Sequence, residues 1–156
     1  MADAEELAEV RRANRAFVAP SEPDRPRSFH SVAGQRAWIE SHENAFAILD
    51  NGEIAGTITL SNAVYGFFQS ANVGYWVAQD RTRRGLATAA LAAVAGVAFD
   101  ELGLHRLEAG TLVDNIASQR VLEKNAFERI GLARRYLLIA GEWRDHLLFQ
   151  LLADDR

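Results

Sequence analysis

The chain has 156 residues, of which 49% are hydrophobic and 24% charged, and these values are typical of one globular domain. Its formal net charge of -4 argues against a nucleic-acid partner, and the lack of cysteine excludes disulfides, thiolate catalysis and cysteine–zinc sites. No apolar run approaches the length of a membrane span and the acidic N-terminus does not resemble a signal peptide, so we expect a cytoplasmic protein with no membrane partner.

The N-terminal third of the chain predicts two helices that are separated by a loop. Apolar residues at helical spacing favour a helix over about residues 4–17. Three prolines within residues 20–26 then predict a loop. A second helix is expected over about residues 32–43, with Ser31 as its N-cap and Trp38 as one of its buried anchors.

Strands are expected in the middle of the chain. Residues 45–49 and 54–60 predict two antiparallel strands, because the Asn-Gly pair between them is the strongest short hairpin signal. A third strand is expected over residues 71–78, and Gly74 within it predicts a bulge or a close backbone approach.

The remainder of the chain alternates helices and strands. We expect, in order, a helix from Gly85 to Gly103, a strand over residues 105–113, a helix from Asn115 to about residue 125, and two strands over about residues 134–139 and 143–152. Alternation combined with hairpins predicts an α/β fold with a mixed sheet. No repeat or linker divides the chain, so residues 1–156 are expected to form a single domain.

A strand, a basic turn and an alanine-rich helix follow one another directly over residues 74–88. The turn carries Arg81, Arg83 and Arg84 in front of Gly85. Such a junction presents free backbone N–H groups and the positive end of a helix, which suits a phosphorylated ligand. The alternative is an ordinary strand–loop–helix connection whose arginines are solvated.

A second polar pair lies at the start of the next predicted helix. Asn115 and Ser118 are one turn apart and follow directly after the strand over residues 105–113. If this strand and the strand over residues 71–78 are parallel neighbours, the two helix N-termini flank one crevice at the carboxyl edge of the sheet.

Together these segments resemble the GCN5-related N-acetyltransferase (GNAT) superfamily, and within it the ribosomal-protein-alanine acetyltransferase group. The resemblance is strongest over residues 45–152, and its motifs are Gly74-Tyr75-Trp76-Val77, Arg84-Gly85-Leu86-Ala87-Thr88, Leu102-Gly103-Leu104-His105-Arg106, the run from Asn115 to Lys124, and the run from Gly141 to His146. It implies a central, twisted, mostly antiparallel sheet that is flanked by helices. The usual first strand of the family is missing before the first helix. Either the given start is late or the sheet lacks an edge strand, and in the second case the exposed sheet edge would favour a homodimer.

The resemblance implies direct attack of a primary amine on the thioester of acetyl-CoA, with no metal. The family's pyrophosphate loop falls on Thr82 to Ala87, where Thr82 departs from the pattern and the neighbouring arginines would supply the missing charge. A backbone N–H, expected from Val77, would bind the thioester carbonyl. The implied cofactor-binding residues are Tyr75, Trp76, Val77, Arg83, Arg84, Gly85, Leu86, Ala87, Thr88, Asn115 and Lys124.

The resemblance also implies a catalytic set of Ser118, Asn115 and Asn72. In many family members a tyrosine at the position of Leu122 is the general acid that protonates the departing thiolate. Ser118 is the expected substitute for that tyrosine. Asn115 would bind the pantetheine arm or fix a water, although it could serve only as a helix cap. Some relatives carry glutamate at the position of Asn72, and an asparagine there could only hold a water.

Aromatic side chains are the candidates for the acceptor site. The candidates are Trp38, Tyr65, Phe67, Phe68 and Trp143, which could instead pack in the core, cover the substrate or form a dimer patch. The chain is thus expected to be an N-acetyltransferase that acts on a protein N-terminal α-amine or on a small-molecule amine. The alternative is a CoA-binding GNAT-like module without efficient turnover.

Overall fold

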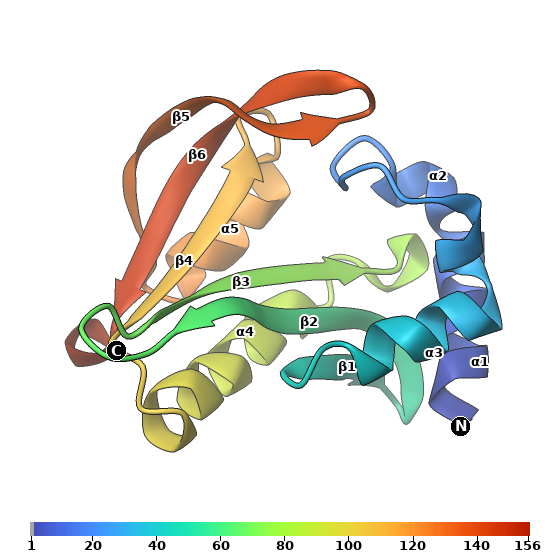
Figure 1. Ribbon diagram of the computed structural model, residues 1–156, viewed down its shortest axis with the longest axis horizontal. Coiled ribbons are helices and arrows are strands. Elements are labelled where there is room, and N and C mark those ends of the chain that lie inside the picture. Colours follow the sequence, from blue (N-terminus) through green and yellow to red (C-terminus); the bar gives the residue numbers. More distant parts are fainter. Residues whose placement is uncertain (1) are drawn as a thin grey trace.

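The computed structural model describes residues 2–156. Its six strands form one sheet with the order β1-β2-β3-β4-β6-β5 (Figure 1). The strands are β1 (Ala45–Asp50), β2 (Glu53–Val64), β3 (Ser70–Val77), β4 (Arg106–Leu112), β5 (Glu128–Ile139) and β6 (Glu142–Leu152). Neighbouring strands are antiparallel except β3 and β4, which are parallel. The predicted mixed and mostly antiparallel sheet is therefore confirmed.

Helices lie on one face of this sheet and beside its β1–β2 end. They are α1 (Ala2–Ala13), α2 (Arg15–Val18), α3 (Val32–Glu40), α4 (Leu86–Gly96), which continues as a π-helical turn (Val97–Glu101), and α5 (Ile116–Lys124). Figure 1 shows α4 and α5 behind the strands, whereas α1 and α3 lie near β1 and β2. No helix within residues 2–156 is long and apolar enough to cross a membrane.

The main core lies between the sheet and the helices α4 and α5. Alternate strand residues point to this face, among them Ile58, Leu107 and Phe149, and they pack with Leu91 of α4 and Leu122 of α5. Each of these five side chains is almost completely buried, so the core fixes the position of α5 against β3 and β4.

The first predicted helix is divided at Asn14. The side-chain amide of Asn14 donates to Val10 O at 2.9 Å, and its oxygen accepts from the backbone N–H of Gln79 at 2.7 Å. This buried asparagine ties the helix end to the segment after β3, a long-range contact that helical periodicity does not reveal. The predicted N-cap of α3 is confirmed, because Ser31 Oγ accepts from the backbone N–H of Gly34 at 3.0 Å.

The bulge that Gly74 predicted is absent, and the close backbone approach occurs at another glycine. The β2–β3 register runs without interruption past Gly74, where an added Cβ would meet only Thr59 Oγ1 at 3.8 Å. At Gly56, in contrast, an added Cβ would lie 2.1 Å from the backbone oxygen of Trp76. Gly56 therefore allows the backbones of β2 and β3 to approach closely.

Replacing Gly56 with alanine should lower the free energy of unfolding by about 1–3 kcal/mol, because the new methyl group collides with backbone that cannot move aside. Urea denaturation measures the change. Gly74→Ala is the matched control, since it lies on the neighbouring strand with free space around it. Equal stability losses in the two variants would contradict the prediction.

Candidate functional site

The parallel strands β3 and β4 separate shortly after they begin. Ser70, Ala71 and Asn72 pair with Arg106, Leu107 and Glu108, and this is the whole β3–β4 ladder. Beyond it the two strands diverge, as Figure 1 shows, with β3 running on to Val77 and β4 to Leu112. The two strands are parallel neighbours, so the condition set for a crevice between the two helix N-termini is met, and the sheet opens between the strands.

The edge of β3 that faces this opening has free backbone groups. Ala78 donates its N–H to Ala55 O of β2 at 2.7 Å, and successive residues of an antiparallel strand direct their backbone groups to opposite sides. Trp76 therefore faces β2, whereas the backbone groups of Tyr75 and Val77 face the opening. An extended ligand can pair with such an edge as an added strand would.

A cavity of about 580 Å³ occupies the opening and receives side chains from both faces of the sheet. Asn72 and Glu108, which are directly opposite each other on β3 and β4, line it from the face that lacks α4 and α5. Tyr75 and Ser118 line it from the α5 face. Two ligands that approach from opposite faces can therefore meet through the gap between the strands.

On the α5 face, two hydroxyl groups are hydrogen-bonded to each other. Tyr75 Oη lies 2.9 Å from Ser118 Oγ and 3.2 Å from Ser118 O. Tyrosine has one hydroxyl hydrogen, so when Tyr75 donates it to Ser118 Oγ, the hydrogen of Ser118 is free for a third group. Leu122 is fully buried in the core and supplies no polar atom here.

Burial raises the pKa of the Tyr75 hydroxyl to about 12, while the hydrogen bond to Ser118 acts in the opposite direction. The raised value means that the ionised tyrosine is disfavoured in the folded protein, so Tyr75 contributes stability that is lost as the pH rises from about 10 to 12. An absorbance titration at about 295 nm should show this late ionisation. Tyr75→Phe should remove the component near pH 12, and its persistence in that variant would contradict the assignment.

Asn115 acts as the N-cap of α5, because its Oδ1 accepts from the backbone N–H of Ser118 at 3.1 Å. This contact fixes the first turn of the helix and with it the position of Ser118. Asn115 also lines the cavity, so the capping role and a ligand-binding role are compatible.

On the opposite face, the structure adds a carboxylate that the sequence reasoning missed. Glu108 is half-buried in the cavity wall, and its Oε1 lies 3.8 Å from Arg106 Nη1. It is paired with Asn72 at the point where the strands separate. His146 also lines the cavity, with Nδ1 3.0 Å from Arg144 O, but it is paired with Leu112 at the far end of β4.

The start of α4 follows the end of β3 through one short connection. Its N-cap is Gly85, which has a φ of 77° and open space where a Cβ would be. The free N–H groups of the first turn come from Leu86, Ala87 and Thr88. Asn125 donates to Thr88 O at 3.2 Å, and this contact brings the end of α5, including Lys124, beside the start of α4.

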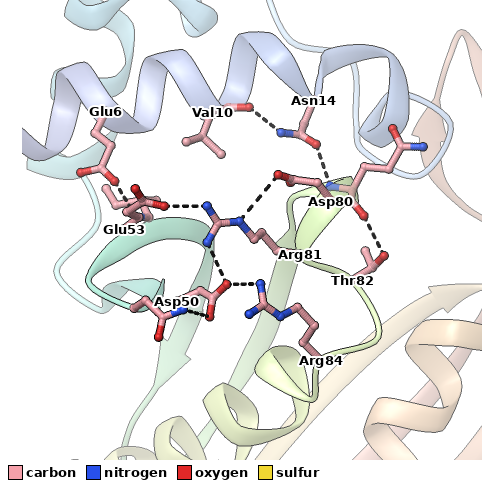
Figure 2. Close-up of polar contacts among 12 residues, drawn as sticks. Glu6, Val10, Asn14, Asp50, Glu53, Asp80, Arg81, Thr82 and Arg84 are labelled. Carbon is pink, nitrogen blue, oxygen red and sulfur yellow. Dashed lines mark hydrogen bonds and ion pairs between the residues drawn. The ribbon is translucent and has the colours of Figure 1, made fainter.

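The arginines of the turn before α4 differ in how far carboxylates already pair with them (Figure 2). Arg81 donates to Asp50 at 2.8 Å and to Glu53 at 2.6 Å, and Arg84 is also paired with Asp50. The expectation that Arg81 supplies charge to an anion is wrong for this structure, because carboxylates already hold its guanidinium. Arg84 is half exposed, and Arg83 is exposed with a φ of 60°.

The aromatic candidates for the acceptor site are widely separated. Trp38 lines the cavity and lies with its ring centroid 4.9 Å from that of His42. The others lie outside the cavity lining, and these are Tyr65, Phe67, Phe68 and Trp143. The first three belong to the β2–β3 turn, at the opposite end of β3 from the opening, so the structure does not bring them to the acceptor side. All four are exposed, which also excludes them from the core.

The architecture combines an opened strand edge, a nearby helix N-terminus and a cavity lined from both faces of the sheet, which suits the class of proteins that bring two ligands together. The sequence matches the family described as "Acetyltransferase (GNAT) domain" over residues 1–128. A probable N-acetyltransferase YjcK of Bacillus subtilis is 35% identical, with 98% of this chain and 90% of the relative covered. The [Ribosomal protein uS5]-alanine N-acetyltransferase of Escherichia coli is 34% identical, with 98% and 84% covered.

Comparison with solved structures indicates the same family. Mycobacterium smegmatis RimJ in complex with CoA-disulfide superposes with a TM-score of 0.92 at 35% identity, over 98% of this chain and 78% of that chain. The chain belongs to the GNAT acetyltransferase family, and it is an N-acetyltransferase.

Proposed function

We propose that this protein transfers the acetyl group of acetyl-CoA to a primary amine by direct attack. The main support for this proposal is that one cavity at the β3–β4 opening receives side chains from both faces of the sheet. Similar structures from this family were solved with CoA, including RimJ of M. smegmatis.

The residues present fit acetyl-CoA. The free edge of β3 at Tyr75 and Val77 matches the amides of a pantetheine arm, and the N–H groups after Gly85 match a diphosphate. The open space at Gly85 leaves room for such a group close to the backbone. Arg83, Arg84 and Lys124 would add positive charge around it. Trp76 is the exception, because its side chain points to the other face, where its Nε1 donates to Thr57 Oγ1 at 2.8 Å.

When bound, acetyl-CoA supplies an activated acetyl group to the opening. The backbone N–H of Val77 would donate to the acyl oxygen as negative charge develops there. Ser118 would donate its hydroxyl hydrogen to the departing sulfur, with Tyr75 hydrogen-bonded to Ser118 Oγ. The second proton that the attacking nitrogen loses would return to Ser118 through solvent, so that the proton count of the transfer closes. On the other face, Glu108 would accept the proton that the incoming ammonium must lose, and Asn72 beside it would orient the amine or a water.

The charged side chains that line the cavity indicate how many positive charges the acceptor carries. Glu22 lines the cavity, but its carboxylate is 2.6 Å from the buried guanidinium of Arg11, so this pair carries no net charge. Glu108 is the other carboxylate of the cavity lining. Its ion pair with Arg106 is longer, at 3.8 Å, and Arg106 is partly exposed and lies outside the cavity lining, so Glu108 is the carboxylate more accessible to an acceptor. This arrangement supports an acceptor with a single positive charge, such as a protein N-terminal α-amine, or a small monoamine, over a polyamine. The E. coli relative, named for an alanine of ribosomal protein uS5, supports the protein N-terminus.

A turnover assay that detects free CoA thiol tests this proposal. The acceptors would be peptides with a free N-terminal alanine, the same peptides with a blocked N-terminus, small monoamines and a polyamine. Binding is tested separately by thermal unfolding, where CoA at 100 times its dissociation constant should add about 2.7 kcal/mol. Stabilisation without turnover on any acceptor would favour the CoA-binding module, and no stabilisation would refute the cofactor assignment. The homodimer predicted from the sequence stays a prediction, and the exposed turn with Phe67 and Phe68 is its candidate surface.

A further inference from the structure

Thr111 of β4 has a buried hydroxyl group without a hydrogen-bond partner. The residue is 4% exposed, and its Oγ1 is one of four buried side-chain polar atoms in residues 2–156 that have none. Thr111 also lines the cavity at the β3–β4 opening. A buried hydroxyl that has lost its water partners costs free energy unless another group bonds to it.

The position of Thr111 in the sheet shows which part of the cavity it serves. Thr111 pairs with Leu147 of β6, which belongs to the core on the α5 face. Leu107 and Ala109, at alternate positions of β4, also belong to that core, so Thr111 points to the same face. It therefore lines the cavity on the face to which Tyr75 and Ser118 belong, the face opposite Glu108.

The other polar side chains of this region already have partners. Tyr75 and Ser118 bond to each other, and Asn115 caps the helix. The remaining three unpartnered atoms belong to Arg11, His30 and Gln35, which lie in the α1–α3 region. Thr111 Oγ1 is thus the buried polar side-chain atom of the α5 face, within the described residues, that has no protein partner.

We propose that Thr111 Oγ1 binds the thioester-bearing end of the pantetheine arm through a hydrogen bond. This inference rests on the proposed function, because it assigns a new contact to the same acetyl-CoA. The unpaired hydroxyl is then a feature of the ligand-free protein, and acetyl-CoA supplies the missing partner. Thr111 is a binding residue, and no proton passes through it.

The test is Thr111→Val, which keeps the shape of the side chain and removes its hydroxyl. The dissociation constant of CoA, measured by calorimetry, should rise about 3- to 10-fold, and KM for acetyl-CoA should rise in parallel, which is the range expected for one neutral hydrogen bond. The melting temperature of the ligand-free variant should be unchanged or higher, because the variant no longer buries an unpaired hydroxyl. Thr111→Ser, which keeps a hydroxyl, should retain most of the affinity.

Several results would overturn the inference. Unchanged CoA affinity together with an unchanged KM for acetyl-CoA in Thr111→Val would show that the hydroxyl does not contact the ligand. A lower melting temperature with unchanged affinity would show that the hydroxyl has a partner in the free protein, such as a buried water. Equal affinity losses in the valine and serine variants would assign the effect to packing. If the unmodified protein binds no CoA, the proposed function itself fails, so the two failures are distinguishable.

Discussion

Replacing Glu108 with glutamine is expected to lower kcat/KM for the amine acceptor about 100- to 10,000-fold at neutral pH, the usual range for a general base. Glutamine keeps the size of the side chain but cannot accept a proton. Glu108 lines the cavity beside Asn72, where β3 and β4 separate, on the face opposite Tyr75 and Ser118. An amine that enters from that face therefore passes the carboxylate before it reaches the opening.

The pH dependence of this variant separates a base from a group that only binds the ammonium. At alkaline pH the free amine is increasingly neutral, so Glu108→Gln should recover a large part of its activity if Glu108 is the base. A loss confined to KM and constant with pH would assign Glu108 to binding instead. Glu9→Gln is the matched control, because Glu9 is exposed on α1 and has no ion pair within the described residues. Full activity of Glu108→Gln at neutral pH would refute both roles.

Local signals predicted the turns and helix caps better than the lengths of the strands. The Asn-Gly turn, the Ser31 cap and the Asn115 cap are contacts between residues close in sequence, and all three are present. The β5 strand begins at Glu128, six residues before the predicted start, because it pairs with β6 through two register shifts. At the start of β5, Glu128 pairs with Gln150, 22 positions later, and the register shifts leave no periodic pattern in β5 itself.

In the candidate site, too, features built from contiguous residues could be predicted from the sequence, whereas contacts between residues far apart in the sequence could not. The motifs predicted the opened edge of β3 and the start of α4, since the residues of each feature are contiguous. Glu108 was not among the sequence candidates, because only the β3–β4 register brings it beside Asn72. Likewise, no local pattern shows that Tyr75 reaches Ser118, 43 positions later, or that the cluster around Asp50 already binds Arg81.

Replacing Ser118 with alanine is expected to lower kcat at least about 100-fold, because the departing thiolate loses its proton donor. The dissociation constant of CoA should remain nearly the same, since the strand edge and the start of α4 are unchanged. Stopped-flow detection of free thiol under acetyl-CoA saturation measures the first quantity, and calorimetry measures the second. An unchanged kcat would exclude Ser118 as the acid, and a loss explained by weaker CoA binding would make it a binding residue.

The Tyr75–Ser118 hydrogen bond allows a second test, which distinguishes the residue that donates the proton from the residue that positions it. Tyr75→Phe removes the tyrosine hydroxyl but leaves Ser118 in place, so it should slow turnover less than Ser118→Ala does. The double variant should be no slower than Ser118→Ala, because Tyr75 acts through Ser118, and residues that act as a unit are not additive. If instead Tyr75→Phe is the slower single variant, the tyrosine donates directly to the sulfur and Ser118 positions it.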